Sequence, residues 1–140
     1  MSDVHDFKYC TMYLKKHKKS NKLILFVCFK DNVIIDDVNI ITIIIKDYNN
    51  FIKKNNNLSI IVDARGIMRC TKNVAFWTSD FMLQFKQIYK SNIDKVAIIL
   101  ELPVMKLLLN SVTTIHPFVV PTNVVNNNKS AIAFVINKTD

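Results

Sequence analysis

Glycine is almost missing from this sequence, with one glycine among 140 residues. Phosphate-binding loops, dinucleotide fingerprints and nucleophile elbows each need more than one glycine at fixed spacing, so these classes of site are excluded. The three cysteines, Cys10, Cys28 and Cys70, fit neither a disulfide framework nor a zinc-binding pattern. We therefore expect a protein of a reducing compartment that holds no metal and no other cofactor.

Long apolar runs are also missing. No run reaches the ~20 residues of a membrane-spanning helix, and residues 1–15 lack the apolar region of a secretory signal. Half of the residues are nevertheless hydrophobic, which is enough for one folded domain over residues 1–140. We expect a cytoplasmic protein whose contact with a membrane, where it occurs, is peripheral.

Acidic residues are fewer than basic ones, 11 against 19, and the formal net charge is +8. The basic side chains concentrate at Lys15, Lys16, Lys18, Lys19 and Lys22. One hypothesis assigns these lysines to an anionic surface such as lipid headgroups. The alternative is a solvated hairpin tip whose like charges discourage pairing at a sheet edge. Nucleic-acid binding is disfavoured, because no aromatic side chains alternate with the lysines to stack on bases.

Apolar periodicity predicts strands and helices in a regular order. Strands are expected at 7–14, 22–30, 58–63, 95–100 and 131–136, with a hairpin loop at 15–21 and an Asn-rich loop at 123–128. Helices are expected from Asp36 or Asp37 to Lys54, from Thr71 to Ile88 and from Pro103 to about Thr114. The order ββαβαβαβ predicts a single α/β domain that opens with an antiparallel hairpin and continues as a mainly parallel sheet.

Catalytic groups do not cluster in the sequence. None of the three histidines lies in a motif with a serine or cysteine nucleophile, and no pair of them has metal-ligand spacing. Asp63 ends a predicted strand, where α/β sheets place ligands, but it can instead pair with Arg65 or cap the adjacent turn. Basic neighbours could lower the pKa of Cys70, although an ordinary thiol is the favoured interpretation. We expect no enzymatic activity.

The predicted helix after Pro103 is apolar on nearly all sides. Only Lys106, Asn110 and Ser111 give it a narrow polar strip, whereas a helix that covers one face of a small sheet needs a single apolar stripe. The surplus leucine surface predicts a second contact with a protein partner, an apolar ligand or a membrane surface. Ordinary burial beneath a neighbouring loop is the alternative.

Several segments resemble CRAL-TRIO lipid-binding domains. Residues 58–67, Leu-Ser-Ile-Ile-Val-Asp-Ala-Arg-Gly-Ile, resemble the strand of that family that ends in an Asp-x-x-Gly-apolar turn. An aromatic-rich helix follows in both, and residues 89–99 are similar to the family's passage from a helix-ending Tyr into the next strand. Leu102-Pro103, the leucine-rich helix and residues 115–119 are similar to its strand–Pro–helix passage. Order and spacing agree over about residues 58–120.

STAS domains have a related βα layout and are the competing resemblance. Their switch segment carries an Asp-Ser-Ser-Gly-like turn, whereas residues 69–73 here read Arg-Cys-Thr-Lys-Asn. The phosphorylation switch of that family is therefore not expected. The CRAL-TRIO resemblance also has departures, since His116 stands where that family commonly has a lysine.

The CRAL-TRIO resemblance implies a non-enzymatic domain that binds a lipid or another hydrophobic ligand between a sheet floor and a movable helical lid. The residues assigned to this pocket are Phe76, Trp77 and Phe81 of the second predicted helix and Met105, Leu108, Leu109 and Val112 of the third. The alternative is a STAS-like interaction module that oligomerises, or binds a protein partner, through the leucine-rich third helix. In that case Leu108→Asp would yield monomers.

Overall fold

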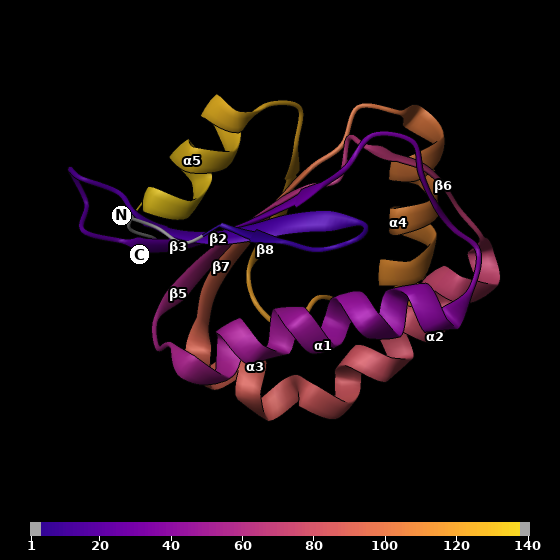
Figure 1. Ribbon diagram of the computed structural model, residues 1–140, viewed down its shortest axis with the longest axis horizontal. Coiled ribbons are helices and arrows are strands. Elements are labelled where there is room, and N and C mark those ends of the chain that lie inside the picture. The colour runs from indigo at the N-terminus through magenta and orange to yellow at the C-terminus, as the bar shows by residue number, and fades with distance from the viewer. Residues whose placement is uncertain (1–3, 138–140) are drawn as a thin grey trace.

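A six-stranded sheet forms the centre of the structure, a computed structural model that describes residues 4–137 (Figure 1). The strand order is β1-β2-β3-β5-β7-β8. These strands are β1 (His5–Asp6), β2 (Cys10–Lys16), β3 (Leu23–Phe29), β5 (Leu58–Asp63), β7 (Ile93–Ile99) and β8 (Thr122–Val125). The pairs β1–β2 and β2–β3 are antiparallel, and β3, β5, β7 and β8 run parallel to one another. A separate two-stranded sheet joins β4 (Val33–Ile35) to β6 (Ile67–Cys70).

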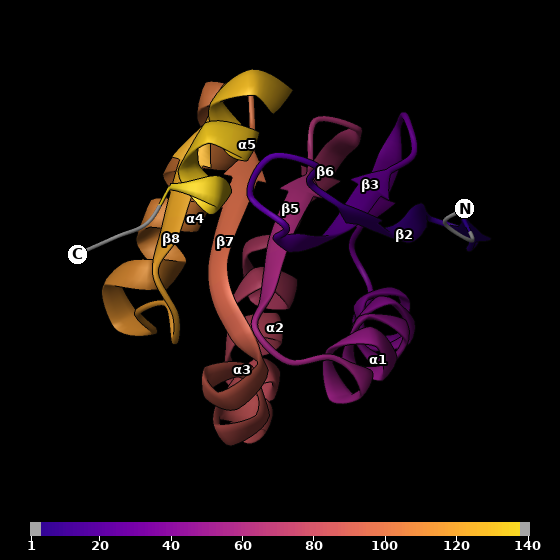
Figure 2. The ribbon, with the colours of Figure 1, turned by 90° about the vertical axis from the view of Figure 1, so that its left-hand side faces the viewer.

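Helices cover both faces of the central sheet (Figures 1 and 2). One face carries α1 (Val38–Lys54), α2 (Lys72–Met82), the short 3-10 helix η1 (Leu83–Phe85), α3 (Lys86–Asn92) and α4 (Pro103–Ile115). The other face carries α5 (Asn128–Ile136). None of the helices between residues 4 and 137 combines the length and the apolar composition that crossing a bilayer requires.

The first helix shows how local sequence signals determine this arrangement. Isoleucines at helical spacing bury one side of α1, although isoleucine by itself favours strands. The side chain of Asp37 accepts a hydrogen bond from the backbone N–H of Asn39 at 2.7 Å, which satisfies a free donor at the start of the helix. Lys53 and Lys54 occupy the last turn, where positive charge is favourable. The predicted bounds of this helix are confirmed.

The predicted fold class is confirmed as well. The first seven elements of the expected order correspond to β2, β3, α1, β5, α2, β7 and α4, with the hairpin antiparallel and the later strands parallel. The helix predicted from Thr71 to Ile88 is divided into α2, η1 and α3. The small sheet of β4 and β6 was not expected. It pairs two short runs that flank α1 and β5 in the sequence.

The end of the chain differs from the prediction. Residues 131–136, predicted as the last strand, belong to α5, and the last strand β8 falls largely within the predicted loop 123–128. The side chain of Asn127 accepts a hydrogen bond from the backbone N–H of Ser130 at 2.9 Å and so starts the helix. A short apolar run has no periodicity that separates a strand from a buried helix, and this cap decides between the two.

A buried lysine fixes α5 to the sheet. Lys95 of β7 is 3% exposed, and its Nζ donates to the backbone carbonyl oxygens of Phe134, at 3.3 Å, and of Asn137. Both carbonyls lie at the C-terminal end of α5, where the helix dipole favours a cation. Around this contact, α5 closes the smaller of the two hydrophobic clusters, made of Ile24, Ile61, Ala97, Ile99, Ala131 and Val135.

Candidate ligand-binding pocket

A pocket of about 370 Å³ lies between the central sheet and the helical layer formed by α1, α2 and α4. Residues 116–122, which connect α4 to β8, form another side of it. This volume is near the lower end of the range for pockets that hold small organic molecules. Its floor and its α1 wall consist of Val27, Phe29, Val62, Val96 and Ile98 of the sheet and Ile41, Ile44, Ile45 and Tyr48 of α1.

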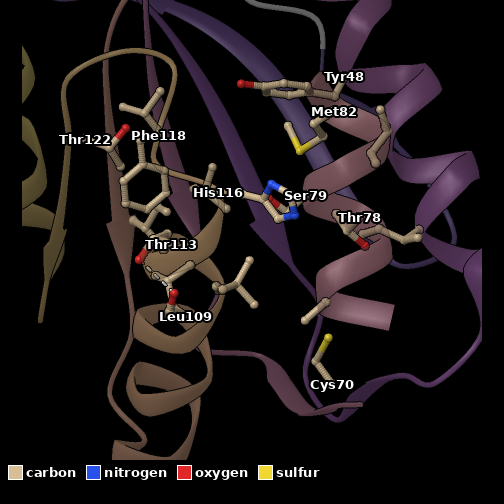
Figure 3. A pocket seen from close by; sticks show the side chains of 18 of the residues that line it. Tyr48, Cys70, Thr78, Ser79, Met82, Leu109, Thr113, His116, Phe118 and Thr122 are labelled. Atoms are coloured by element: carbon tan, nitrogen blue, oxygen red, sulfur yellow. Dashed lines mark hydrogen bonds between the residues drawn. The ribbon is translucent and has the colours of Figure 1, made fainter. Parts of the chain in front are cut away.

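Small side chains on α2 leave the space that the pocket occupies. Ala75, Thr78, Ser79 and Met82 line the pocket and follow one another at i, i+3, i+4 and i+7, so they form one face of the helix (Figure 3). The first three side chains are small, and leucines at these positions would occupy part of the pocket. The volume is therefore encoded by this face of α2.

The opposite wall is the inner face of α4. Met105, Leu108, Leu109 and Val112 line the pocket, and these are the four residues of the third helix that the sequence analysis assigns to it. Their spacing of three, one and three residues keeps them on one side of the helix. The structure thus brings together the predicted residues of this helix.

The three aromatic residues assigned to the pocket on the second helix lie elsewhere. The rings of Trp77 and Phe81 stack with their centroids 4.9 Å apart, and Phe81 meets Phe85 edge-on at 5.5 Å. Phe76 lies 6.0 Å from the ammonium nitrogen of Lys72. None of the three predicted aromatics is among the lining residues within 4–137. A periodic row of small residues beside them forms the face of α2 that does line the pocket, but small size alone does not show that this face meets the sheet.

The hydroxyl groups on three threonines of the pocket are engaged locally. Thr78 Oγ1 donates to the carbonyl of Val74 at 2.7 Å, and Thr113 Oγ1 donates to the carbonyl of Leu109 at 3.0 Å. Thr122 Oγ1 donates in the same way to the carbonyl of Val120 at 2.9 Å. These bonds use the one donor of each hydroxyl, so the threonines present mainly methyl groups and acceptor lone pairs to the pocket.

The environment of Cys70 favours the protonated thiol over the thiolate. Cys70 lines the pocket near the start of α2, and burial raises the pKa of its thiol. The thiolate is the nucleophilic form of cysteine, so this environment opposes nucleophilic chemistry. Within residues 4–137 there is no group of three or more His, Cys, Asp or Glu side chains arranged to hold a metal ion.

Asp63 and Arg65 form a closed pair at the end of β5. Arg65 donates through Nε to Asp63 Oδ1 at 2.9 Å and through Nη2 to Asp63 Oδ2 at 2.7 Å. These hydrogen bonds lower the pKa of Asp63. The structure therefore agrees with the alternative in which Asp63 pairs with Arg65 rather than binding a ligand. The following Gly66 is required by space, because a Cβ there would clash with the carbonyl oxygen of Lys30.

The basic residues gather around the turn between β2 and β3. Lys15, Lys16, Lys18 and Lys19, called the turn lysines below, are all exposed. Lys22, the fifth residue assigned to an anionic surface, instead forms an ion pair with Asp94 at the start of β7. Lys22 is thus engaged within the sheet, and the four turn lysines are the ones that face solvent.

The outer face of α4 is apolar and exposed. Val104 and Leu107 are each 66% exposed and Ile115 is 62% exposed. Leu108, proposed from the sequence as the residue to test for an interface, lies on the pocket side of the helix. The structure corrects this choice, because Leu107 is the leucine that a partner could reach.

The comparisons with known proteins concern the fold. A family model described as "Domain of unknown function (DUF7793)" matches residues 18–138. No curated protein matches the sequence. Among solved structures, a similar one is the crystal structure of an uncharacterized protein of the DUF3478 family with a SpoIIAA-like fold, from Shewanella loihica PV-4. The two chains are 11% identical with a TM-score of 0.58, over 94% of this chain and 97% of that chain.

This likeness shows the fold alone. A SpoIIAA-like fold is a STAS-like fold, so the comparison favours the STAS-like competitor of the sequence analysis. The CRAL-TRIO resemblance receives no support from either comparison.

Proposed function

The chain belongs to the DUF7793 family, whose description names no function, and we propose that it is a non-enzymatic STAS-like binding module for a small nonpolar molecule. The observation that carries this proposal is the pocket of about 370 Å³ between the sheet, α1, α2 and α4. Its lining is almost entirely aliphatic and aromatic, which is the usual composition of sites for apolar ligands.

The expected affinity follows from the apolar surface that a ligand would bury. Each methylene transferred from water into such a pocket contributes about 0.8 kcal/mol. A chain of roughly eight methylenes therefore gains about 6 kcal/mol, before the cost of ordering the ligand. A Kd of 1 mM corresponds to about 4 kcal/mol, so the Kd is below millimolar when ordering the ligand costs less than about 2 kcal/mol.

The groups inside the pocket favour binding over chemistry. The thiol of Cys70 stays protonated because burial raises its pKa, and the hydroxyls of Thr78, Thr113 and Thr122 donate to backbone carbonyls. These groups shape and close the pocket, and the proposal assigns them no step in a reaction.

The proposal is tested by titrating the purified chain with the apolar fluorescent probe N-phenylnaphthylamine. Probe fluorescence should rise and saturate with the wild type. Ala75→Phe, which fills the pocket from α2, should weaken binding at least about tenfold, since it removes the space for the probe. The matched control is Ala133→Phe on the exposed side of α5, which should bind as the wild type does. No saturable binding to the wild type, or equal binding by Ala75→Phe, would contradict the proposal.

Self-association through the outer face of α4 is a second candidate function. The exposure of Val104, Leu107 and Ile115 on one side of a single helix, with Ser111 between the last two, is the observation that favours it, because exposed large apolar side chains that gather on one face mark interaction sites. Light scattering should show an oligomer that Leu107→Glu converts to monomers. Ile43→Glu replaces another exposed isoleucine, on α1, and should leave the oligomer intact. A monomeric wild type would exclude self-association by this face.

A further inference from the structure

Tyr48 brings an unused hydroxyl donor to the pocket wall. Its phenol leaves α1 and, in the view of Figure 3, points toward the side where Phe118 and Thr122 lie. The ring meets Tyr89 edge-on, with the centroids 6.0 Å apart. The hydroxyl of Tyr89 donates to Asn49 Oδ1 at 2.6 Å, whereas the hydroxyl of Tyr48 has no hydrogen-bond partner within residues 4–137.

The Tyr48 hydroxyl remains a neutral donor at any physiological pH. Burial, assisted by the neighbouring Tyr89, raises the pKa of the Tyr48 phenol above its ordinary value. An anionic phenolate that would repel an acceptor is therefore not formed.

Two more polar side chains reach the pocket without partners in the described part of the chain. They are Ser79 on α2 and His116 at the C-terminal end of α4. In Figure 3 the His116 ring extends into the space between α4 and α2. A serine hydroxyl and an imidazole can each donate one hydrogen bond while uncharged. The apolar pocket thus has a small set of donors without partners in residues 4–137, and Tyr48 is the one on the α1 wall.

Carboxylate, ammonium and guanidinium side chains are missing from the lining within residues 4–137, and His116 contributes an imidazole. No Asp, Glu, Lys or Arg is among the lining residues between positions 4 and 137. A carboxylate or an ammonium group bound at the Tyr48 hydroxyl would lose its hydration, and that hydroxyl supplies no opposite charge, which is strongly unfavourable. A neutral oxygen loses less on entering and gains a hydrogen bond from one of the free donors.

We propose that the ligand is an uncharged amphiphile: an apolar chain or ring with one hydrogen-bond-accepting oxygen that is bound by the Tyr48 hydroxyl. This inference rests on the proposed function, and it adds the chemical class of ligand. Alcohols, ketones, esters and ethers with a medium-length apolar part belong to this class, and free fatty acids in their ionised form do not.

The class is tested with three ligands that share one apolar chain: decanol, decanoate and decyltrimethylammonium. Each competes with N-phenylnaphthylamine for the wild-type chain at neutral pH. Decanol should displace the probe at concentrations roughly a hundredfold lower than either ion, because neither ion gains an opposite charge from the Tyr48 hydroxyl. Equal or stronger displacement by decanoate or by the ammonium compound would overturn the inference.

The role of Tyr48 is tested by Tyr48→Phe, which removes only the hydroxyl. The affinity for decanol should fall about fivefold, the usual range for one neutral hydrogen bond, and the affinity for the probe should stay unchanged. Tyr13→Phe is the matched control, since it also removes one phenolic hydroxyl but lies on β2, stacked on Phe26, and is not among the residues that line the pocket. An unchanged decanol affinity in Tyr48→Phe, or an equal loss in the control, would overturn the assignment.

The outcomes separate the inference from the proposed function. A wild-type chain that fails to bind the probe and all three ligands contradicts both. A chain that binds the probe, loses it in Ala75→Phe and ranks the three ligands equally keeps the pocket and refutes the ligand class.

Discussion

The hydrogen bond between Tyr89 and Asn49 gives a sharp test of how the helical layer is held together. Tyr89 of α3 is 4% exposed and Asn49 of α1 is 5% exposed, and their side chains are joined by a bond of 2.6 Å. Tyr89→Phe removes the donor and leaves Asn49 Oδ1 buried without it. An unsatisfied buried acceptor costs about 1–3 kcal/mol, so the free energy of unfolding should fall by about 2 kcal/mol.

Tyr48→Phe provides the comparison within the same structure. It also deletes one phenolic hydroxyl, but that hydroxyl has no partner within residues 4–137, so the expected change is below about 0.5 kcal/mol. For a chain of this size the difference between the two variants corresponds to roughly 5 °C in Tm.

Urea unfolding followed by circular dichroism measures both variants, the single variant Asn49→Leu and the double variant Tyr89→Phe/Asn49→Leu. The double variant should recover part of the loss, because it no longer buries an unpaired acceptor. The reasoning is refuted if Tyr48→Phe costs as much as Tyr89→Phe, or if the double variant shows the simple sum of the single losses.

Three further predictions concern the turn after β5, the turn lysines and the buried phenols. Gly66→Ala should lower the free energy of unfolding by about 1–3 kcal/mol, since the added Cβ meets the carbonyl of Lys30; an unchanged urea midpoint would show that the turn can relax. Glutamine at all four turn lysines should weaken binding to anionic vesicles, measured by sedimentation, by about 1 kcal/mol for each lysine near the surface. Glutamine at Lys46, Lys53, Lys86 and Lys90, which are exposed on α1 and α3, should weaken binding less. Equal losses in the two variants would mean that net charge alone determines binding. Burial raises the pKa values of Tyr48 and Tyr89, so the native state keeps both protons while the unfolded chain loses them above about pH 10. The free energy of unfolding should therefore fall as the pH rises above about 10. Urea midpoints measured from about pH 8 to pH 11 should fall less in the double variant Tyr48→Phe/Tyr89→Phe than in the wild type.

The sequence predicts a helix correctly where the spacing of apolar residues and the residues at the helix ends indicate the same element. α1 was predicted because its isoleucines recur at helical spacing between an Asp N-cap and two C-terminal lysines. The inner face of α4 was predicted because that helix has more leucine than one contact needs, and the structure divides this surface between the pocket and solvent.

The sequence analysis does not identify the α2 wall of the pocket, because it assigns the large side chains of this helix to the pocket and the residues that line it are mostly small. Large aromatic residues drew attention to Trp77 and Phe81, but these rings stack on each other instead of lining the pocket. Empty space is created by small side chains, and nothing in Ala75 or Ser79 by itself indicates which helix face meets the sheet. That orientation depends on how α2 packs against α1 and α4, which is a property of the whole fold.

The choice between two related families was also beyond the sequence. The segments compared with CRAL-TRIO domains are short, and the βα order they share with STAS domains left both in consideration. The overall arrangement of strands and helices, compared over 94% of the chain, favours the STAS-like alternative.

A crystal structure with bromodecanol bound tests the central claim most directly, because anomalous scattering from bromine locates the ligand without reference to the fold. The account predicts a bromine peak between α2 and α4, with the ligand hydroxyl within hydrogen-bond distance of Tyr48. An unliganded structure in which α4 has closed onto α2 and left no space between them, or bromine found only on the outer surface, would contradict it.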